Sequence, residues 1–392
     1  MTAGTPADLP VLREPDLPRT AKDRPDALRT GWTTGACSAA AAKAAATVLT
    51  GRPAPARVSI PLPEPFEGSD RASFAVEAAN GAPEATPPWG QAVVVKDAGD
   101  DPDVTDGAHL TVRLEPDADA DGDLAFSAGD GVGTATKPGL GLPVGAPAIN
   151  GIPRRMIRAA IAEVCDPAGL RCTISVPGGL GMAKKTTNRR LGIEGGISIL
   201  GTTGVVRPFS TASWRASVEQ QIDVLAAQGG REVVLATGGR TERAAMRALP
   251  GLPESAFVAV GDFTGAALRR AVVNGFDTAR FVGMAGKLAK LAAGVMMTHW
   301  TRSKVDPDIL ACLTAEAGGS EDLVDAVRSS NSGRHAFELW TAEGLAGAAG
   351  TRLCDAVADN LARFAEGHLT CHVALIDFDG LEIVTASRRW WT

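Results

Sequence analysis

The chain has 392 residues, of which 45% are hydrophobic and 21% charged, a balance that excludes a disordered or collagen-like protein and predicts two or three globular domains. The net charge of −6 argues against nucleic acid as a partner, and no apolar run reaches the roughly 18 residues of a membrane span. Tyrosine is absent, which excludes acid–base chemistry by a phenol. Six irregularly spaced cysteines and the lack of an apolar signal stretch favour a reduced, cytoplasmic protein.

The first half of the chain reads as one Ala-rich helix among several strands. Residues 1–27 carry Pro, Asp and Arg without periodicity and predict a flexible leader. A helix is expected between its candidate N-cap, Thr33 or Thr34, and Gly51. Residues 28–200 are expected to form an α+β domain. Alternating or β-branched segments predict strands at 57–62, 72–78, 91–97, 109–115 and 171–177, with a second helix at 153–165.

A different rhythm begins near residue 200. Alternation of short apolar runs with helical stretches predicts βαβ units, a parallel sheet and ligands at the carboxyl ends of its strands. We expect a Rossmann-like α/β domain over 201–345, on the cofactor side, followed by a C-terminal helix and β-hairpin over 346–392 that turns at Asp379 and Gly380. The predicted strands are 196–201, 232–238, 256–262 and 279–286, and the helices that follow them are 211–228, 240–248, 264–274 and 286–294.

The net charge conceals two opposed segments. Residues 97–130 carry eleven acidic residues and one arginine, a net −10, whereas residues 151–207 carry nine basic and three acidic residues, a net +6. The acidic run over 117–123 is typical of an exposed turn. The basic segment is interleaved with Gly and Pro, and Arg side chains on loops bind carboxylates or phosphates bidentately. We predict an anionic small molecule there, with a solvated surface as the alternative.

Few residues suggest side-chain chemistry, and each has a plain structural alternative. Asp100, Asp101 and Asp103 lack the calcium-loop spacing, so capping of turns is favoured over a hard cation. The five histidines lack zinc-ligand spacing, and no metal site is predicted. Cys37 follows a turn at a predicted helix N-terminus, yet no histidine is close in sequence, so a packed small residue is favoured over a catalytic thiolate.

Two Gly-containing loops at predicted strand ends are candidate cofactor sites. Each follows an apolar strand and opens a helix, so its N–H groups are placed for a carboxylate, a ribose or a phosphate. Adjacent strand ends of a parallel sheet meet at one edge. The competing placement is Gly201–Gly204, at the end of the first predicted strand. The favoured residues are Thr237, Gly238 and Gly239 in one loop, and Gly261 and Asp262 in the next.

Six long and individually unusual stretches occur in a fixed order. They are RTGWTTGACSAAAAKAA (29–45), KDAGDDPDVTDG (96–107), GDGVGTATKPGL (129–140), AINGIPRRMI (148–157), TNRRLGIEGGISILGTTGVVRP (187–208) and GKLAKLAAGVMMTHW (286–300). From Leu28 to the C-terminal region the chain resembles the CbiD family, the cobalt-precorrin-5B C-1-methyltransferases of corrin biosynthesis. Asp106 stands where that family often has His, so no role of that histidine is carried over.

The resemblance implies methylation of carbon 1 of a ring-contracted cobalt tetrapyrrole on the route to cobalamin, with S-adenosyl-L-methionine as cofactor. It also implies an α+β domain joined to a Rossmann-like one. The macrocycle carries acetate and propionate carboxylates, which the basic segment matches in charge. Methyl transfer from a sulfonium is an in-line displacement, so positioning and the exclusion of water supply much of the acceleration.

Candidate roles follow from this resemblance. A carboxylate, Asp100, Asp101 or Asp103, is expected to accept a proton from the macrocycle or to favour its nucleophilic tautomer. S-adenosylmethionine is expected at the favoured loops, with Gly261 and Asp262 near its ribose or amino-acid end. The substrate contacts are expected from Thr33, Thr34, Arg154, Arg155, Lys184, Arg189 and Arg190.

Two other functions remain as alternatives. A non-catalytic tetrapyrrole-binding protein could use the same basic face, and titration with S-adenosylmethionine separates it from an enzyme. A nucleotide-dependent oxidoreductase is suggested only by the βαβ half, and the G-x-G-x-x-G fingerprint with its later acidic residue is absent. The sequence leaves open whether the substrate already carries cobalt and how many subunits assemble, a homo-oligomer included. No nucleic acid or membrane partner is expected.

Overall fold

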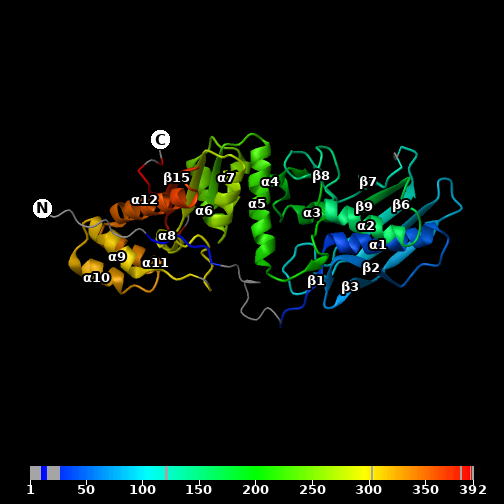
Figure 1. The fold of residues 1–392 in the computed structure, drawn as a ribbon, viewed down its shortest axis with the longest axis horizontal. Coiled ribbons are helices and arrows are strands. Elements are labelled where there is room, and N and C mark those ends of the chain that lie inside the picture. Colours follow the sequence, from blue (N-terminus) through cyan, green and yellow to red (C-terminus); the bar gives the residue numbers. More distant parts are fainter. Residues whose placement is uncertain are drawn as a thin grey trace. The chain divides into compact units, whose positions relative to one another are not determined.

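The computed structural model describes residues 10–15, 27–119, 122–301, 303–379, 382–388 and 390. It divides into two compact units, each shown in Figure 1. Unit 2 is Pro18–Thr211, and unit 1 consists of Met1–Leu17 together with Ala212–Thr392. The division follows Thr211, somewhat beyond the change of rhythm seen near residue 200. None of the helices in the described ranges is long and apolar enough to cross a membrane.

A five-stranded sheet is the framework of unit 2. Its order is β4-β5-β6-β9-β7, in which β7 and β9 are parallel and the other neighbours antiparallel. Alternate residues of β5 and β6 are buried, as their sequence period requires. The bounds are β4 Ala78–Ala82, β5 Trp89–Val95, β6 His109–Pro116, β7 Ala125–Ala128 and β9 Leu170–Ser175.

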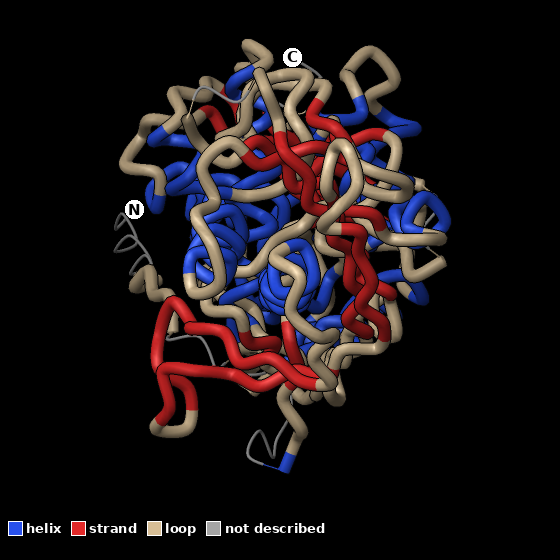
Figure 2. The backbone as a smooth tube through the Cα atoms, turned by 90° about the vertical axis from the view of Figure 1, so that its right-hand side faces the viewer, coloured by secondary structure: helices blue, strands red, loops and turns tan. Residues whose placement is uncertain are grey.

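The Ala-rich segment forms α1 (Thr34–Leu49), which is buried on nearly every face. It contacts the sheet strands β4, β5 and β6 on one side, and α2 (Gly151–Ala162) and β2 (Arg57–Phe66) on others. In Figure 2 the helices of this unit (blue) lie between two groups of strands (red). Small side chains permit the approach, because a Cβ on Gly90 of β5 would lie 2.2 Å from the Ala45 carbonyl oxygen. Alanine is therefore selected here by packing distance as well as by helix propensity.

Short elements complete unit 2. The β2–β3 hairpin is antiparallel, and two further pairs, β1–β11 and β8–β10, are only two residues long. These short pairs join segments distant in sequence, and no local pattern predicted them. The remaining bounds are β1 Gly31–Trp32, β3 Ser69–Ala75, β8 Thr134–Ala135, α3 Gly179–Ala183, α4 Asn188–Leu191, β10 Ile193–Glu194 and β11 Val205–Val206.

The strand predicted at 196–201 is wrong, and so is its assignment to the second domain. Ile197 and Ile199 are buried in the core of unit 2, where each makes only an isolated bridge, to Val132 and to Ile149 respectively. Gly201 adopts a φ of +138°, which interrupts an extended ladder. The apolar residues of this segment are therefore buried, as their hydrophobicity indicates, but they do not form the predicted strand.

Unit 1 contains the predicted parallel sheet, in the order β13-β12-β14-β15-β16. The first four strands are mutually parallel and β16 is antiparallel to β15. Counted along the chain this order is 2-1-3-4-5, which differs from the 3-2-1-4-5-6 order of a Rossmann sheet. The prediction is therefore confirmed for parallel strands alternating with helices, and the Rossmann label is not. The bounds are β12 Glu232–Ala236, β13 Phe257–Ala259, β14 Thr278–Gly283, β15 Thr370–Ile376 and β16 Ile383–Ala386.

The connections of unit 1 create a switch point in the sheet. The connection from β12 to β13 runs one way and that from β13 to β14 runs back past β12, so right-handed crossovers place α6 and α7 on opposite faces. Ligands of such sheets bind outside the carboxyl ends of the strands where the order reverses. The helices of unit 1 are α5 Thr211–Ala227, α6 Gly239–Ala248, α7 Thr264–Val273, α8 Ala285–Ala292, α9 Pro307–Glu316, α10 Glu321–Arg328, α11 Gly333–Ala342 and α12 Ala346–Phe364, with a 3-10 turn at Glu254–Ala256.

Both ends of the chain contribute to unit 1. The predicted C-terminal hairpin exists as β15 and β16, but it extends the parallel sheet and is not a separate piece; Gly380 of its predicted turn lies outside the described residues. The flexible leader predicted over 1–27 is wrong for residues 10–15. There Arg13 N donates to Gly294 O at 2.9 Å, and Met296 N donates to Arg13 O at 2.9 Å. These partners are nearly 300 residues away, which is why local composition did not reveal them.

Candidate functional site

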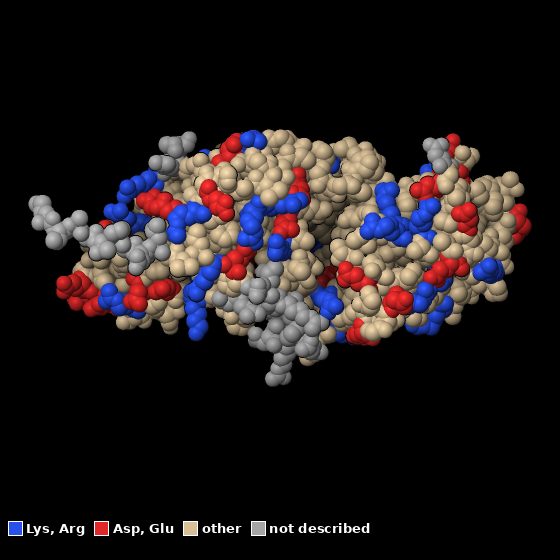
Figure 3. Space-filling model, viewed as in Figure 1, with Lys and Arg blue, Asp and Glu red and all other residues tan. Residues whose placement is uncertain are grey.

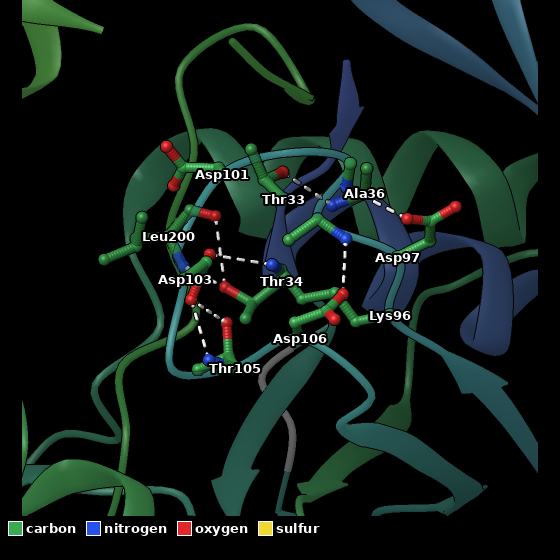
Figure 4. A network of polar contacts seen from close by, with 12 residues as sticks. Thr33, Thr34, Ala36, Lys96, Asp97, Asp101, Asp103, Thr105, Asp106 and Leu200 are labelled. Carbon is green, nitrogen blue, oxygen red and sulfur yellow. Dashed lines mark hydrogen bonds and ion pairs between the residues drawn. The ribbon is translucent and has the colours of Figure 1, made fainter. Parts of the chain in front are cut away.

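The acidic stretch after β5 folds back across the N-terminus of α1 (Figure 4). Thr33 caps this helix, its side chain accepting from Ala36 N at 3.1 Å, as the sequence predicted. Trp32 N donates to Asp97 O at 2.8 Å, which holds the acidic stretch against the helix entry. Thr34 Oγ1 accepts from Leu200 N at 3.0 Å. Three segments distant in sequence therefore meet at the start of α1.

The centre of this meeting point is a buried ion pair. Lys96 Nζ lies 2.7 Å from Asp103 Oδ2, and the lysine side chain is only 1% exposed. The other carboxylate oxygen of Asp103 accepts from Thr105 N at 2.7 Å and from Thr105 Oγ1 at 2.6 Å. Burial favours a higher pKa for Asp103, but Lys96 and Thr105 outweigh it and hold that pKa below its ordinary value. Asp103 is therefore ionised at neutral pH.

The other candidate carboxylates of the stretch have different surroundings. Asp100 is exposed and accepts from Arg29 N at 2.7 Å. Asp101 is half-buried and accepts from Phe209 N at 2.8 Å, and burial raises its pKa. Asp106, which stands where the resembled family often has His, accepts from Ala98 N at 2.8 Å and so closes a turn.

A pocket of about 200 Å³ opens beside the ion pair. Of the three predicted catalytic aspartates, only Asp103 lines it, whereas both predicted substrate residues of the helix entry, Thr33 and Thr34, do. The volume is below the ~300–1,000 Å³ of a site for a whole drug-sized ligand, so it admits one edge or substituent of a larger molecule. The remaining lining residues are Val104, Thr105, Thr186, Thr187, Asn188, Ile197, Ser198, Leu200 and Val206.

Sequence reasoning missed most of these pocket residues. Thr105, Asn188 and Ser198 carry no reactive group, and nothing in local periodicity marks them. The available signal was the resemblance, because the stretches 96–107 and 187–208 that carry it contain nine of the twelve lining residues. The unusual stretches thus contain more of the pocket-lining residues than the search for chemically reactive side chains selects.

Cys37 is a packed residue, as the favoured interpretation held. It is fully buried in α1, and burial raises the pKa of its thiol to about 12. A thiol at a helix N-terminus becomes reactive only when the solvent or a cation stabilises its thiolate, and burial prevents that here.

The basic residues predicted to bind the substrate differ in their exposure and in the contacts that they already make. Arg155, Lys184 and Arg189 are exposed, and the last two flank the pocket-lining residues 186–188. Arg154 is directed elsewhere, because its Nε donates to Ile149 O at 2.8 Å and its guanidinium lies 4.9 Å from the centre of the Phe126 ring. Burial lowers the pKa of Arg154. Arg190 is half-buried.

The two opposed charge segments of the sequence partly neutralise each other. Arg171 Nη2 lies 2.7 Å from Asp117 Oδ2, and Arg158 forms an ion pair with Asp123. Figure 3 shows Lys and Arg gathered on unit 2 over the area where α2 and β9 lie in Figure 1, with acidic residues at its margin. The predicted basic surface therefore exists, but two of its nine cations are already paired with the acidic run.

The first predicted cofactor loop lies at the switch point of the parallel sheet. Thr237 follows β12, and Gly238 N donates to Thr241 Oγ1 at 2.9 Å, which closes the entry to α6. A Cβ on Gly238 would meet no atom within 4 Å, so the backbone at this point is open to a ligand. Gly239 begins α6, whose first N–H groups lack intrahelical acceptors.

The second predicted loop is already tied to its neighbours. Asp262 Oδ1 lies 3.0 Å from Lys287 Nζ and accepts from Thr298 Oγ1 at 2.9 Å. Burial favours a higher pKa for Asp262, but Lys287 and Thr298 outweigh it and lower that pKa. Gly261 takes a φ of +55° and its carbonyl accepts from Lys287 at 2.7 Å. Gly201, in the competing placement, belongs to unit 2 and lies against Thr33.

The described ranges contain no group of three or more His, Cys, Asp or Glu residues arranged to hold a metal ion. The aspartates of the stretch after β5 instead accept from backbone N–H groups, Arg29, Lys96 and Thr105. This is the capping role that their spacing favoured.

Comparison with known proteins gives consistent matches. The family models CbiD and CbiD, C-terminal domain, match residues 21–208 and 297–387. A cobalt-precorrin-5B C(1)-methyltransferase of Salinispora arenicola (strain CNS-205) is 61% identical, covering 98% of this chain and 99% of its own. The protein of the same name from Rubrobacter xylanophilus is 59% identical and covers 96% of each chain. A crystal structure of a cobalamin biosynthesis protein (cbiD) from Archaeoglobus fulgidus matches at 27% identity and a TM-score of 0.37, over 70% of this chain and 83% of that one.

Proposed function

This chain belongs to the CbiD family, and we propose that it transfers a methyl group from S-adenosyl-L-methionine to carbon 1 of cobalt-precorrin-5B, a step of cobalamin biosynthesis. The match with relatives of that name over nearly the whole chain carries the proposal. A cytoplasmic location agrees with this role and stays a prediction, as does the number of subunits.

The methyl donor is assigned to the first loop of the parallel sheet. S-adenosylmethionine supplies an electrophilic methyl group when bound. The open backbone at Gly238 and Gly239 supports close approach of a nucleoside or carboxylate, and the loop adjoins the switch point where doubly wound sheets bind ligands. Thr237 adds a hydroxyl at the same strand end. Asp262 and Gly261, at the next strand end, would form the margin of this site.

The tetrapyrrole is assigned to unit 2. Its carboxylates match the exposed cations Arg155, Lys184 and Arg189, whereas Arg154 and Arg190 are half-buried. An edge of the macrocycle enters the pocket at Thr33 and Thr34. Because these residues hold a rigid helix entry, they can fix the position of the reacting carbon, which is the main contribution that a displacement reaction asks of the protein.

Methylation of a carbon that carries no negative charge leaves one proton to be removed from the macrocycle. Among the predicted carboxylates Asp101, which lies on the same loop as Asp103 but does not line the pocket, suits this role best, because burial raises its pKa and Phe209 N donates to only one of its oxygens. Asp100 is exposed to water, and Asp103 has partners on both oxygens. Asp101 would accept this proton.

The activity is tested by incubating the chain with S-adenosylmethionine and cobalt-precorrin-5B. We expect S-adenosylhomocysteine and a product heavier by one methyl group, in equal amounts. Binding of the macrocycle without turnover, and without binding of S-adenosylmethionine, would instead identify a tetrapyrrole-binding protein.

The donor assignment is tested with Gly238→Val. A Cβ at this position would meet no atom within 4 Å, so we expect an unchanged melting temperature and an S-adenosylmethionine Kd at least about tenfold higher, since the backbone is no longer open. An unchanged Kd would move the donor to the competing placement near Gly201.

A further inference from the structure

The loop after β5 carries a buried charge that the proposed chemistry does not use. The Lys96 side chain is 1% exposed, and its only ion-pair partner in the described ranges is Asp103, whose side chain is 24% exposed. A buried ammonium is costly unless it is paired and hydrogen-bonded. The pair thus joins an inaccessible cation to a carboxylate that lines the pocket.

The carboxylate of Asp103 is fixed on both sides. Thr105 donates twice to Oδ1 and Lys96 donates to Oδ2. These three bonds restrict the side chain to one orientation, in the way that supporting hydrogen bonds lock a functional group. The carboxylate stays ionised and lines the pocket, whereas Lys96, which balances its charge, is buried and lines no part of the pocket.

The wall of the pocket itself carries no cation. None of the twelve lining residues is Lys, Arg or His; they are five threonines, a serine, an asparagine, four aliphatic residues and Asp103. Such a wall accepts a methyl-bearing or neutral edge of a ligand, whereas a carboxylate brought beside Asp103 meets like charge, which is strongly unfavourable away from water. Outside the pocket, Lys184 and Arg189 attract carboxylates.

We propose that Asp103 is a specificity residue that sets the register of the macrocycle by rejecting its carboxylate side chains, and that Lys96 is the positioning residue that keeps Asp103 ionised and oriented. The inference rests on the proposed function, because it takes the tetrapyrrole as the occupant. The four rings of a tetrapyrrole are alike in shape, so methylation at one carbon requires that only one ring edge enter the pocket. Attraction of the macrocycle's carboxylates outside the pocket and their repulsion inside it together select the ring edge that enters.

Removal of the charge by Asp103→Asn tests the proposal through kinetics at saturating S-adenosylmethionine. If other ring edges can now enter, unproductive complexes form, and kcat and KM fall by the same factor, about fourfold if all four edges bind equally. The ratio kcat/KM then stays constant. A fall in kcat/KM with KM unchanged or raised would overturn the proposal, because a proton acceptor or a damaged pocket behaves in that way.

Two further variants guard against a trivial loss of folding. The double variant Lys96→Met with Asp103→Asn removes both charges and leaves none unpaired, and we expect it to show the same parallel fall. Asp106→Asn is the matched control, because it removes one charge from the same loop outside the pocket, and both constants should stay at their original values. A parallel fall in this control would overturn the assignment to the pocket charge.

The pH dependence of the Lys96→Met variant tests the role of Lys96. Charged or titratable groups near Asp103 are Lys96 itself, Asp101 on the same loop and the neutral thiol of Cys37 on α1. In Lys96→Met the burial of Asp103 is no longer opposed by a cation, so its pKa rises. We expect this variant to resemble Asp103→Asn at acidic pH and the original protein at alkaline pH. A defect that is equal at all pH values would show that Lys96 serves the fold alone.

Binding of the macrocycle tests the role of Asp103 even if the chain transfers no methyl group. If the original chain transfers no methyl group, the proposed function fails, and the affinity for the macrocycle still tests the pocket. Asp103→Asn should then bind cobalt-precorrin-5B about fourfold more tightly, because more registers are allowed. Equal or weaker binding would overturn the inference.

Discussion

At the residue scale, the arginines of unit 2 differ by what already occupies them. Arg171 and Arg158 are paired with aspartates, and Arg154 is turned toward a carbonyl and an aromatic ring. Arg155 and Arg189 are exposed and make no side-chain hydrogen bond or ion pair with the described residues. The five arginines are equivalent in the sequence. Only the folded structure distinguishes those that are available to bind a ligand from those that already have partners.

The double variant Arg155→Ala with Arg189→Ala tests this distinction. Loss of two charge-assisted contacts should raise the Kd of cobalt-precorrin-5B by at least about tenfold and leave that of S-adenosylmethionine unchanged. Isothermal titration with each ligand measures both constants. Arg158→Ala serves as the control, because that guanidinium is already paired; similar losses for both ligands would refute the assignment.

At the element scale, glycine and alanine determine how closely segments approach. A Cβ on Gly179 or on Gly196 would lie 2.2 Å and 2.1 Å, respectively, from the Gly131 carbonyl oxygen. Three Gly-rich loops therefore pack on one another. Glycine at these three positions serves packing within unit 2.

Gly90→Ala should destabilise unit 2, because the new methyl group would press β5 against α1 at Ala45. Overpacking of this kind costs about 1–3 kcal/mol, which urea unfolding measures. Gly181→Ala is the matched control, since its Cβ would meet no atom within 4 Å and the residue is helical in α3. Equal stability of the two variants would show that β5 and α1 can separate without cost.

An ion-pair cluster links three elements of unit 2 and gives stability a pH dependence. Glu163, at the end of α2, pairs with Arg71 of β3 and with Lys43 of α1. Hydrogen bonds from Arg71 and Lys43 lower the pKa of Glu163 from 4.5 to about 2. Because the folded pKa is depressed, the contribution is complete above pH 4.5 and is lost as the pH falls toward 2.

Glu163→Gln should therefore remove part of the acid sensitivity. We expect the free energy of unfolding to fall less steeply between pH 4.5 and 2 in this variant than in the original chain, and to be lower in the variant at neutral pH. Urea titrations at several pH values measure both. Parallel pH profiles would show that the cluster contributes nothing, as happens for many exposed pairs.

Elements with a strong local period were predictable, and those made by distant partners were not. Strands β5 and β6 and the βα alternation after residue 230 follow from burial on alternate residues and from short apolar runs. The two-residue pairs, the bridges of Ile197 and Ile199, and the pocket depend on contacts across long stretches of chain. The cluster of neighbouring carboxylates in the sequence indicates Asp103, but no sequence pattern indicates its partner Lys96.

At the scale of the whole molecule, each unit has its own hydrophobic core. One cluster of buried residues lies wholly between Ala36 and Ile199, and the other between Val218 and Trp390. Separate cores favour separate cooperative transitions. We expect calorimetry to resolve two unfolding events.

A core variant in each unit assigns the transitions. Leu110→Ala, in β6, should lower only the melting temperature of unit 2, and Phe281→Ala, in β14, only that of unit 1, each at a cost of about 2–5 kcal/mol. If either variant lowers both transitions equally, the two cores unfold as one cooperative system.

The hydrogen bonds of Arg13 with Gly294 and Met296 affect the order in which the two units can fold during synthesis. Unit 2 is inserted in the sequence of unit 1, so it leaves the ribosome complete while its host still lacks every strand of its sheet. Domains tend to fold as they emerge. Arg13 must therefore wait through about 280 further residues for its partners, and the sheet of unit 1 can be completed only after β15 and β16 have been synthesised.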